Sequence, residues 1–561
     1  MTALTARPHA LNGAEPRPID WLDETELERV RTALAARTCY RDGAGPIEMV
    51  QTHISTVFLT ARHVFKFKRP LDVGFADFRA LAQRERYCRA EVALNARLAP
   101  GVYLDVLPLR NVGSGYRFEG GGPVVDWCVV MARLPAEDML DRRLRRGPIA
   151  PAQLEALARL LADFHRTAAG APELARFGSE AVVRGNWEEN FRQTEAFVGD
   201  VLPAATLASI RAAVEGWLAR NRALLEARAS GGFVRDGHGD LRCEHVYLGD
   251  PIKVIDCIEF NDRFRYGDVA NDLAFLLMDL TAQGQPRLAQ ALLERYVALS
   301  GDAELPRLVA FYACYRAYVR GKVTAFKLLD RNLAGAQRAA ARVRAESFFR
   351  LALDFAGQTA PPVLVLVAGL IGTGKTALAE ALAQRGALAT WNSDALRKTL
   401  AADAAATGAA ADYGAEIYTP AWNARTYDAL FAQADAALRT GRPVILDASF
   451  ARRADRERAR ALAQRLGARL LVLECRLDDA RTRERLRQRE QAGTSVSDGR
   501  VALYERQRAA FEPIDEAGPA EHRIVVTDRP AAELAEALLP ALALPPPLFG
   551  AGGTAPRRSA S

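Results

Sequence analysis

A glycine-rich stretch in the last third of the chain, GLIGTGKT at residues 369–376, has the residue types and spacing that bind phosphate. It fits the pattern G-x-x-x-x-G-K-[ST], in which glycines let backbone N–H groups close around phosphate oxygens. In this pattern the lysine reaches the β- and γ-phosphates, and the hydroxyl after it ligates Mg²⁺. The sequence therefore predicts a nucleoside triphosphate site formed by Gly369, Gly372, Thr373, Gly374, Lys375 and Thr376, the last of them also a metal ligand.

The segments on either side of this loop are expected to be the strand and the helix that position it. Residues 363–368 are a continuous apolar run, which is typical of a buried parallel strand. Residues 377–384 are good helix formers with apolar positions near a 3.6-residue period. A strand, a glycine turn and a helix aim the positive end of the helix at the phosphates, so a turn without ligand is the less favoured interpretation.

Two lysines in the first part of the chain could also handle phosphate. Two β-branched and aromatic runs predict a hairpin, and its second strand alternates Phe65 and Phe67 with Lys66 and Lys68. A period of two places both lysines on one face of the strand. The local pattern alone favours a solvated face about as much as a functional one.

Three short motifs follow in an informative order: HGD at 238–240, ID at 255–256, and GD at 267–268 ahead of DLA at 272–274. With the hairpin lysines and a long helix carrying glutamates, they resemble the aminoglycoside phosphotransferase family over about residues 30–350. The resemblance implies an α+β protein-kinase-like domain of two lobes, in which catalysis is mostly positioning and neutralisation of charge.

The resemblance also implies roles for single residues. Asp240 becomes the catalytic carboxylate that accepts or orients the proton of an acceptor hydroxyl, and Asp256 becomes a metal ligand. Lys66 is preferred over Lys68 as the phosphate-binding lysine. Its helix partner is Glu91.

Glu85 is the second choice for the helix glutamate that pairs with the lysine. Asp272 is expected to brace the catalytic loop, and His165 to be a packed helix histidine. The chain departs from the family at His245, five residues after the catalytic aspartate, where the family usually has a metal-binding Asn. Because imidazole suits softer metals than Mg²⁺, this second metal ligand and full activity of the first domain are both in question.

The rest of the first domain is expected to be mainly helical. Helices are predicted over about 75–98, 154–165 and 207–225, with a loop from Asn186 between the last two and a strand over 252–260. A further helix over 312–328 carries Arg316 and Arg320 on one face, for which solvation is the favoured interpretation.

The second domain repeats βα units, with strands near 363–368, 387–391, 443–448, 470–475 and 523–527. This pattern predicts an α/β fold with a parallel sheet covered on both faces. Over about residues 362–530 it resembles the small P-loop kinases related to polynucleotide kinase and zeta-toxin-like enzymes. The resemblance makes Asp394 the general base, Arg397 a substrate ligand and Asp447 a metal ligand of the Walker B kind.

An arginine-rich helix near the end of this domain contains Arg485 and Arg489, which suit a lid that closes over phosphates. The alternative is a solvated helix with Glu–Arg pairs, and the sequence favours neither. An acidic residue in a first helical turn, such as Asp394, is also a common cap.

Composition limits the partners. A net charge of +7 over 561 residues is modest, so nucleic acid is an unlikely partner, and no apolar run is long enough to span a membrane. Seven scattered cysteines indicate reduced thiols and a cytoplasmic protein.

We therefore expect a kinase-like domain at 19–356, a linker at 357–362 and a P-loop domain at 363–535, with disordered ends at 1–18 and 545–561. The expected activity is transfer of the γ-phosphoryl of ATP, with Mg²⁺, to hydroxyl acceptors at one or both domains. The alternative is a regulatory protein with a degenerate kinase domain and an ATPase switch.

Overall fold

The computed structural model describes residues 24–36, 46–52, 54–74, 76–113, 115–330, 333–386, 388–406, 419–492, 501–544 and 548–549. The chain divides into two compact units. The first comprises Met1–Val182 and Ala227–Ser300, and the second comprises Val183–Glu226 and Gly301–Ser561. The expected disordered start at 1–18 lies outside the described residues, as does the expected tail except for residues 548–549.

The first unit contains a six-stranded antiparallel sheet in the order β1-β2-β3-β6-β4-β5. Its strands are β1 (Glu48–Gln51), β2 (Ser55–Leu59), β3 (His63–Lys68), β4 (Tyr103–Asn111), β5 (Tyr116–Arg117) and β6 (Val124–Ala132). Phe65 and Phe67 pack on one face of the sheet with residues of α1 (Glu24–Ala36). The other face packs against α2 (Leu81–Asn95), so the lysines that alternate with these phenylalanines point toward α2.

After this sheet the first unit is mainly helical, with two short strand pairs; the HGD motif follows one of their strands and the ID motif follows another. The helices are α3 (Leu140–Arg146), α4 (Pro151–Thr167), α7 (Asp262–Arg265), α8 (Val269–Ala282) and α9 (Pro286–Ser300). The strand pairs are β7 (Val234–Asp236) with β10 (Tyr266–Asp268), and β8 (Val246–Tyr247) with β9 (Lys253–Val254).

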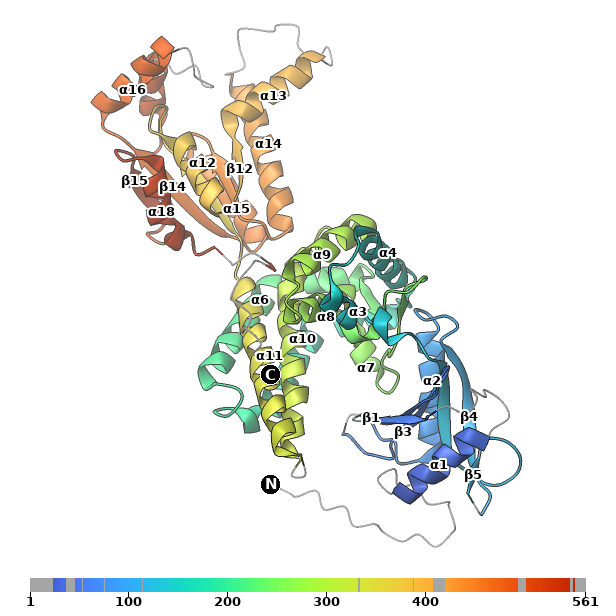
Figure 1. The fold of residues 1–561 in the computed structure, drawn as a ribbon. Coiled ribbons are helices and arrows are strands. Elements are labelled where there is room, and N and C mark those ends of the chain that lie inside the picture. Colours follow the sequence, from blue (N-terminus) through green and yellow to red (C-terminus); the bar gives the residue numbers. More distant parts are fainter. Residues whose placement is uncertain are drawn as a thin grey trace. The chain divides into compact units, whose positions relative to one another are not determined.

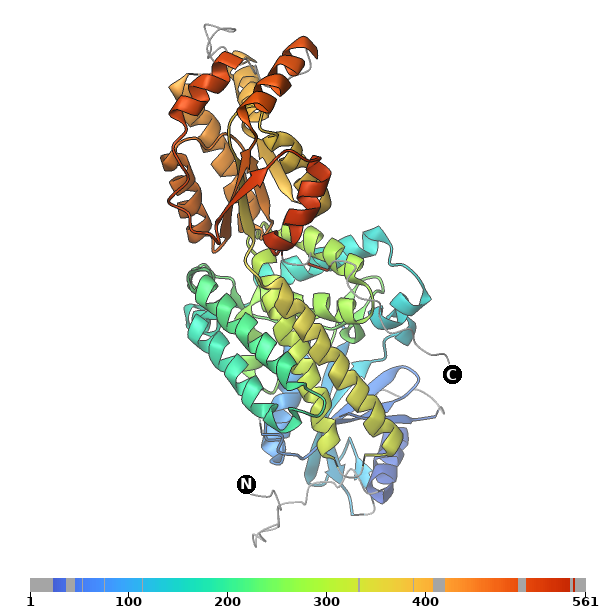
Figure 2. The same cartoon turned by 90° about the vertical axis from the view of Figure 1, so that its left-hand side faces the viewer.

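The second unit holds the long helices α10 (Pro306–Phe326) and α11 (Gly335–Gln358), which run side by side (Figure 2). It also includes most of α5 (Glu180–Gln193) and α6 (Ala204–Ser230). A five-stranded parallel sheet follows in the order β12-β13-β11-β14-β15. Its strands are β11 (Val363–Ala368), β12 (Ala389–Asn392), β13 (Val444–Asp447), β14 (Arg469–Arg476) and β15 (His522–Val526).

Helices cover both faces of the parallel sheet (Figure 1). On one face lie α14 (Pro420–Arg439) and α15 (Arg453–Arg465), and on the other lie α12 (Lys375–Gly386) and α18 (Ala531–Leu542). The remaining helices are α13 (Ser393–Ala406), α16 (Asp479–Ala492) and α17 (Val501–Ala510). The predicted fold class is therefore confirmed: an α+β kinase-like part is followed by an α/β part with a parallel sheet.

Three expectations about the helical region are wrong. The loop expected from Asn186 is part of α5, and Trp187 on this helix is buried, because packing overrides the moderate helix propensity of its aromatic residues. The strand expected over 252–260 is reduced to β9, because Asp256 has a φ of 65°, which an extended strand does not contain. Arg316 is buried rather than solvated.

The expected domain limits stay a prediction. The segment between α11 and β11 contains the prolines of the expected linker, but α10 and α11 group with the parallel sheet as one compact unit. Within the described part of the chain, no helix has the length and apolar character that crossing a membrane requires. The six described cysteines are buried free thiols, as expected.

Candidate active sites

The first candidate site lies where β3, α2 and the segment after β9 meet. The Nζ atom of Lys66 donates to Oε1 of Glu91 at 2.8 Å and to Oδ1 of Asp256 at 2.6 Å. Burial alone would lower the pKa of Lys66, but the two carboxylates raise it well above its ordinary value. Lys66 is therefore a fixed cation between a helix glutamate and an aspartate from a different part of the chain.

Asp256 has an unusual backbone. Its φ of 65° is in the left-handed region, which a residue other than glycine rarely adopts. Its N–H donates to the hydroxyl of Tyr103 at 3.1 Å. Burial opposes ionisation, but the ammonium group of Lys66 holds the pKa of Asp256 well below its usual range. Strain of this kind is typical of functional sites, and here it aims an ionised carboxylate at Lys66.

The loop that carries the HGD motif is held in place by Asp272 of α8. Its carboxylate accepts from the backbone N–H of His238 at 2.6 Å and from that of Gly239 at 2.9 Å. A Cβ at Gly239 would lie 2.9 Å from a backbone oxygen of Phe264, and φ there is +83°, so only glycine fits this turn. His165 is buried, with Nε2 3.3 Å from the Asp272 carboxylate. The expected bracing role of Asp272 and the packed state of His165 are both confirmed.

The carboxylate of Asp240 is paired within its own loop. Arg242 donates from Nε and Nη2 to its two oxygens, at 2.8 Å each. This is the two-pronged geometry that arginine offers to carboxylates. The Asp240 side chain is 24% exposed, so an acceptor could reach it.

His245 joins Asp240 to Asp256. Its Nδ1 lies 2.8 Å from the backbone oxygen of Asp240, which can only accept, so Nδ1 carries the proton. Burial, the largest cause, and Arg242 lower the pKa of His245, which favours the neutral ring. Its Nε2 lone pair is then left facing Arg242 Nη2 at 3.2 Å and Asp256 Oδ2 at 3.4 Å.

Asp256 and His245 would together supply part of the ligand set of a divalent cation. A carboxylate oxygen of Asp256 and the neutral Nε2 of His245 are both suitable donor atoms, and they lie close together. Among the described residues, no three or more His, Cys, Asp or Glu side chains are arranged to hold a metal. A cation here would therefore need phosphate oxygens and water as further ligands, as Mg²⁺ usually does.

The second candidate site is built on the turn between β11 and α12. Gly369, Gly372 and Gly374 all have φ in the positive region, at +134°, +81° and +84°. A Cβ at Gly369 would lie 2.5 Å from the backbone oxygen of Cys475. Nζ of Lys375 donates to the backbone oxygen of Leu370 at 2.8 Å, across the loop that would hold phosphate.

Oxygen donors for a cation lie at the carboxyl end of this sheet. Asp447 at the end of β13 is buried, and its Oδ2 accepts from Nδ2 of Asn392 at 2.6 Å. The same Asn392 atom lies 3.5 Å from the hydroxyl of Thr376. A hydroxyl and a carboxylate are the kinds of ligand that Mg²⁺ prefers, so these residues fit that ion.

Asp394 and Arg397 share a face of α13. The Asp394 carboxylate is 3.5 Å from Nη1 of Arg397, and Nη2 of that arginine donates to Asn423 at 2.8 Å. Burial raises the pKa of Asp394, although Arg397 and Lys375 oppose the shift. A partly buried carboxylate with a raised pKa beside a phosphate loop is suited to proton transfer.

The arginines of helix α16 lie in two kinds of surroundings, and the lid role stays a prediction. Arg485 lies beside Gly374 and donates to the backbone oxygen of Thr527 at 3.0 Å, so it faces the phosphate loop. Arg483 and Arg487 instead pair with glutamates at the surface. The side chain of Arg489 lies outside the described residues.

Comparisons with known proteins agree with this arrangement. The model of the phosphotransferase enzyme family matches residues 64–310, and an AAA domain model matches residues 364–514. Uncharacterized proteins of Mycobacterium tuberculosis and Mycobacterium bovis are 30% identical over 483 residues, which cover 85% of this chain and 94% of the relatives. The chain belongs to the same family as these mycobacterial proteins. It joins a phosphotransferase domain to an AAA-type P-loop domain.

Solved structures of kinases are similar to parts of the chain. A choline/ethanolamine kinase family protein from Mesorhizobium loti covers 59% of this chain and 99% of its own length, with 15% identity and a TM-score of 0.37. A gluconokinase from Sinorhizobium meliloti covers 33% of this chain and 92% of its own, with 22% identity and a TM-score of 0.24.

In the phosphotransferase domain, the structure brings the predicted Lys66, Glu91, Asp240, His245 and Asp256 together. Glu85, the runner-up, lies elsewhere on α2 and pairs with Arg89 at the surface. The side chain of Lys68 is fully buried.

Sequence reasoning missed two residues of these sites. Arg242 lies two residues after the HGD motif, but only its two bonds to Asp240 show its importance. Asn392 follows directly after a predicted strand in the P-loop domain. Because ligands of parallel sheets bind at the carboxyl ends of strands, its position was a usable signal.

Proposed function

We propose that the chain is a bifunctional ATP-dependent phosphotransferase, with one site in each domain, that phosphorylates hydroxyl groups of small molecules. The observation that carries the proposal is the triad of Lys66, Glu91 and Asp256, next to a catalytic loop whose Asp240 carboxylate is partly exposed. The phosphate loop with Asp394 beside it supports a second transfer site.

At the first site, Lys66 would bind phosphate oxygens of ATP, and Glu91 would keep its ammonium group in place. Asp256, with His245 as a second donor, would hold Mg²⁺, which neutralises charge on the β- and γ-phosphates. Asp240 would take the proton of the acceptor hydroxyl. The acceptor oxygen then forms a bond to the γ-phosphorus as the bond from that phosphorus to the β,γ-bridging oxygen breaks, and ADP leaves.

At the second site, the N–H groups of the glycine loop and Lys375 would bind the β- and γ-phosphates. Thr376 and Asp447 would hold Mg²⁺, and Asn392 would orient both. Asp394 would accept the proton of the second acceptor, while Arg397 and Arg485 would contact acceptor and phosphate respectively. Arg489 stays a candidate lid residue.

We also propose that the domains have the limits expected above, 19–356 and 363–535, and that the protein works in the cytoplasm. The buried free thiols of the described cysteines are consistent with a reducing compartment.

The test uses ATP labelled at the γ-phosphate and a metabolite extract. We expect labelled small molecules with the intact protein, and identification of those molecules names the acceptors. Lys66→Ala should remove one set of labelled products and Lys375→Ala the other. Absence of any labelled acceptor, with ATP bound at both sites, would contradict the proposal.

A second candidate function follows from the pairing of Asp240. Because Arg242 occupies both oxygens of this carboxylate and His245 replaces the usual Asn, the first domain could bind nucleotide without transfer and act as a sensor for an ATPase in the second. In that case Lys66→Ala would change ATP hydrolysis at the second site but would remove no labelled product.

A further inference from the structure

Lys68 and Glu259 form a buried ion pair next to the first site. Neither residue has a role in the proposed phosphoryl transfer. Nζ of Lys68 contacts Oε1 of Glu259 and also Oε2 of Glu91. The side chains of Lys68 and Glu91 are fully buried, and that of Glu259 is 5% exposed. A lysine so enclosed has no route to a phosphate group, which separates its role from that of Lys66.

The ion pair between Lys68 and Glu259 completes a series of contacts in which acidic and basic side chains alternate. Asp256 contacts Lys66, Lys66 contacts Glu91, Glu91 contacts Lys68, and Lys68 contacts Glu259. Each carboxylate oxygen of Glu91 therefore has its own lysine. Because both lysines stand on one face of β3, they fix the plane of the Glu91 carboxylate as well as its position.

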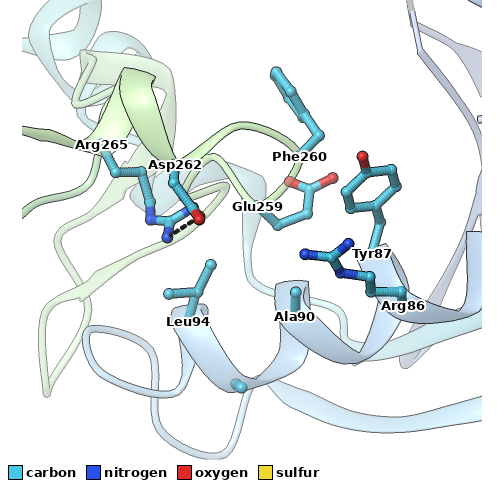
Figure 3. A pocket seen from close by; sticks show the side chains of 9 residues that line it. Arg86, Tyr87, Ala90, Leu94, Glu259, Phe260, Asp262 and Arg265 are labelled. Atoms are coloured by element: carbon cyan, nitrogen blue, oxygen red, sulfur yellow. Dashed lines mark hydrogen bonds and ion pairs between the residues drawn. The ribbon is translucent and has the colours of Figure 1, made fainter. Parts of the chain in front are cut away.

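Glu259, the last residue in this series of ion pairs, belongs to the same polypeptide segment as Asp256. Glu259 is three residues after Asp256, in a stretch without regular secondary structure. Figure 3 shows Glu259 beside Ala90 of α2, in a pocket also lined by Tyr87 and Phe260. Its contact with Lys68 thus ties this segment to β3 at a second point, independent of the contact between Lys66 and Asp256.

We propose that Lys68 and Glu259 are positioning residues that hold Glu91 and Asp256 in place for metal-bound nucleotide, an inference that rests on the proposed function of the first site. When Lys66 binds phosphate and Asp256 binds a cation, their mutual contact is lost. Lys68 then keeps its bonds to Glu91 and Glu259, so the helix glutamate and the metal-binding segment stay fixed.

A contribution to folding stability does not by itself explain the buried ion pair between Lys68 and Glu259. Removing a lysine and a carboxylate from water is costly, and well-packed apolar side chains of similar volume often give equal or greater stability. Groups that orient a metal ligand, in contrast, commonly change metal affinity or activity by about 10- to 100-fold when they are replaced.

The test uses the full chain with Lys375→Ala, which silences the second nucleotide site. Calorimetry gives the affinity for ATP over a series of Mg²⁺ concentrations, and thermal unfolding gives the stability of each variant. Lys68→Met with Glu259→Leu should need about tenfold more Mg²⁺ for half-maximal ATP affinity, and it should unfold at a lower temperature than the parent because Oε2 of Glu91 loses its lysine. Glu259→Gln, which keeps the side-chain shape, should shift the Mg²⁺ requirement in the same direction.

A matched control comes from another buried ion pair of α2. Nε of Arg84 donates to Asp126 of β6 at 2.8 Å, and both side chains are buried. Asp126→Asn should lower the unfolding temperature and leave the Mg²⁺ requirement unchanged.

An unchanged Mg²⁺ requirement in both Glu259 variants would overturn the inference and leave the pair a purely stabilising role. The inference would also fail if Asp126→Asn shifted the requirement equally, since loss of stability would then explain the shift. If the Lys375→Ala parent binds no ATP, the proposed function of the first site fails, and the inference with it, before any variant is compared.

Discussion

The two proposed nucleotide sites would bind phosphate through different kinds of group. In the first site every charged side chain is paired with another: Lys66 with Glu91 and Asp256, and Asp240 with Arg242. In the second, the binding groups are mainly backbone N–H groups of a glycine turn, and Lys375 contacts a backbone carbonyl. To bind ATP as proposed, the first site would have to exchange ion pairs, whereas the second would lose only a hydrogen bond to a neutral backbone carbonyl.

The difference affects how each site can be regulated. An exchange of buried ion pairs depends on the exact position of several chain segments, so small shifts in α2 or the Asp256 segment change affinity. A glycine turn is held by its own backbone and by the strand and helix that flank it. We expect the first site to be the more sensitive of the two to metal, pH and distant substitutions.

The strongest test of the comparison removes one site at a time. Lys375→Ala should abolish binding at the second site and leave one ATP per chain at the first. Lys66→Ala should do the reverse, because each lysine is the main cation for phosphate at its own site. Titration calorimetry counts the sites, and loss of all binding in Lys375→Ala would show that the first site is empty.

The next largest effect concerns proton transfer at the second site. Asp394→Asn should lower phosphorylation of its acceptor by about 10²- to 10⁴-fold, the usual range for a lost general base. Folding and ATP affinity should be kept, because α13 is capped by Asn392, whose Oδ1 accepts from the backbone N–H groups of Asp394 and Ala395. Since burial raises the pKa of Asp394 and the base must be ionised, the rate should fall on acidification at a higher pH than a free aspartate would give. Near wild-type phosphorylation in Asp394→Asn would exclude this residue from the mechanism.

Acid should destabilise the first unit through His238. Burial lowers the pKa of His238 to about 4, below its unfolded value of about 6.5. A depressed pKa contributes stability that is present above pH 6.5 and is lost as the pH falls toward 4. The loss should be about 3 kcal/mol, and urea unfolding at pH 7 and pH 4.5 measures most of it. His238→Gln, which cannot titrate, should flatten this dependence, and an equally steep loss in that variant would contradict the assignment.

The smallest effect expected is a change of metal preference at the first site. If His245 is a metal ligand, Mn²⁺ should support ATP binding there better than Mg²⁺, and His245→Asn should move the preference about tenfold toward Mg²⁺. The measurement is ATP affinity with each metal in the Lys375→Ala chain. An unchanged metal profile would mean that His245 only orders the loop through its bond to Asp240.

Local patterns were enough to predict much of both sites. The glycine loop, its strand and its helix are adjacent in sequence, and the geometry of a strand places Lys66 and Lys68 on one face whatever lies opposite. The βα alternation predicted the parallel sheet for a similar reason, because each unit is set by periodicity within about thirty residues.

The tertiary structure decided what those residues contact. Lys66 and Asp256 are 190 positions apart, and no spacing rule relates them. Only the packing of α2 on the sheet shows that Glu91, rather than Glu85, meets both lysines. The loop expected at Asn186 failed for a similar reason, because burial of Trp187 in an aromatic cluster stabilises a helix that the local sequence only weakly favours.

The sequence by itself thus determined the chemistry that the chain can offer: two sets of phosphate-binding groups, two carboxylates for proton transfer and two folds to carry them. The tertiary structure alone decided that Lys68 is enclosed between Glu91 and Glu259, that Arg242 binds both oxygens of Asp240, and that Asn392 joins Thr376 to Asp447. The physical reason is that backbone periodicity acts over a few residues, whereas the pairing of buried charges depends on which distant segments exclude water together.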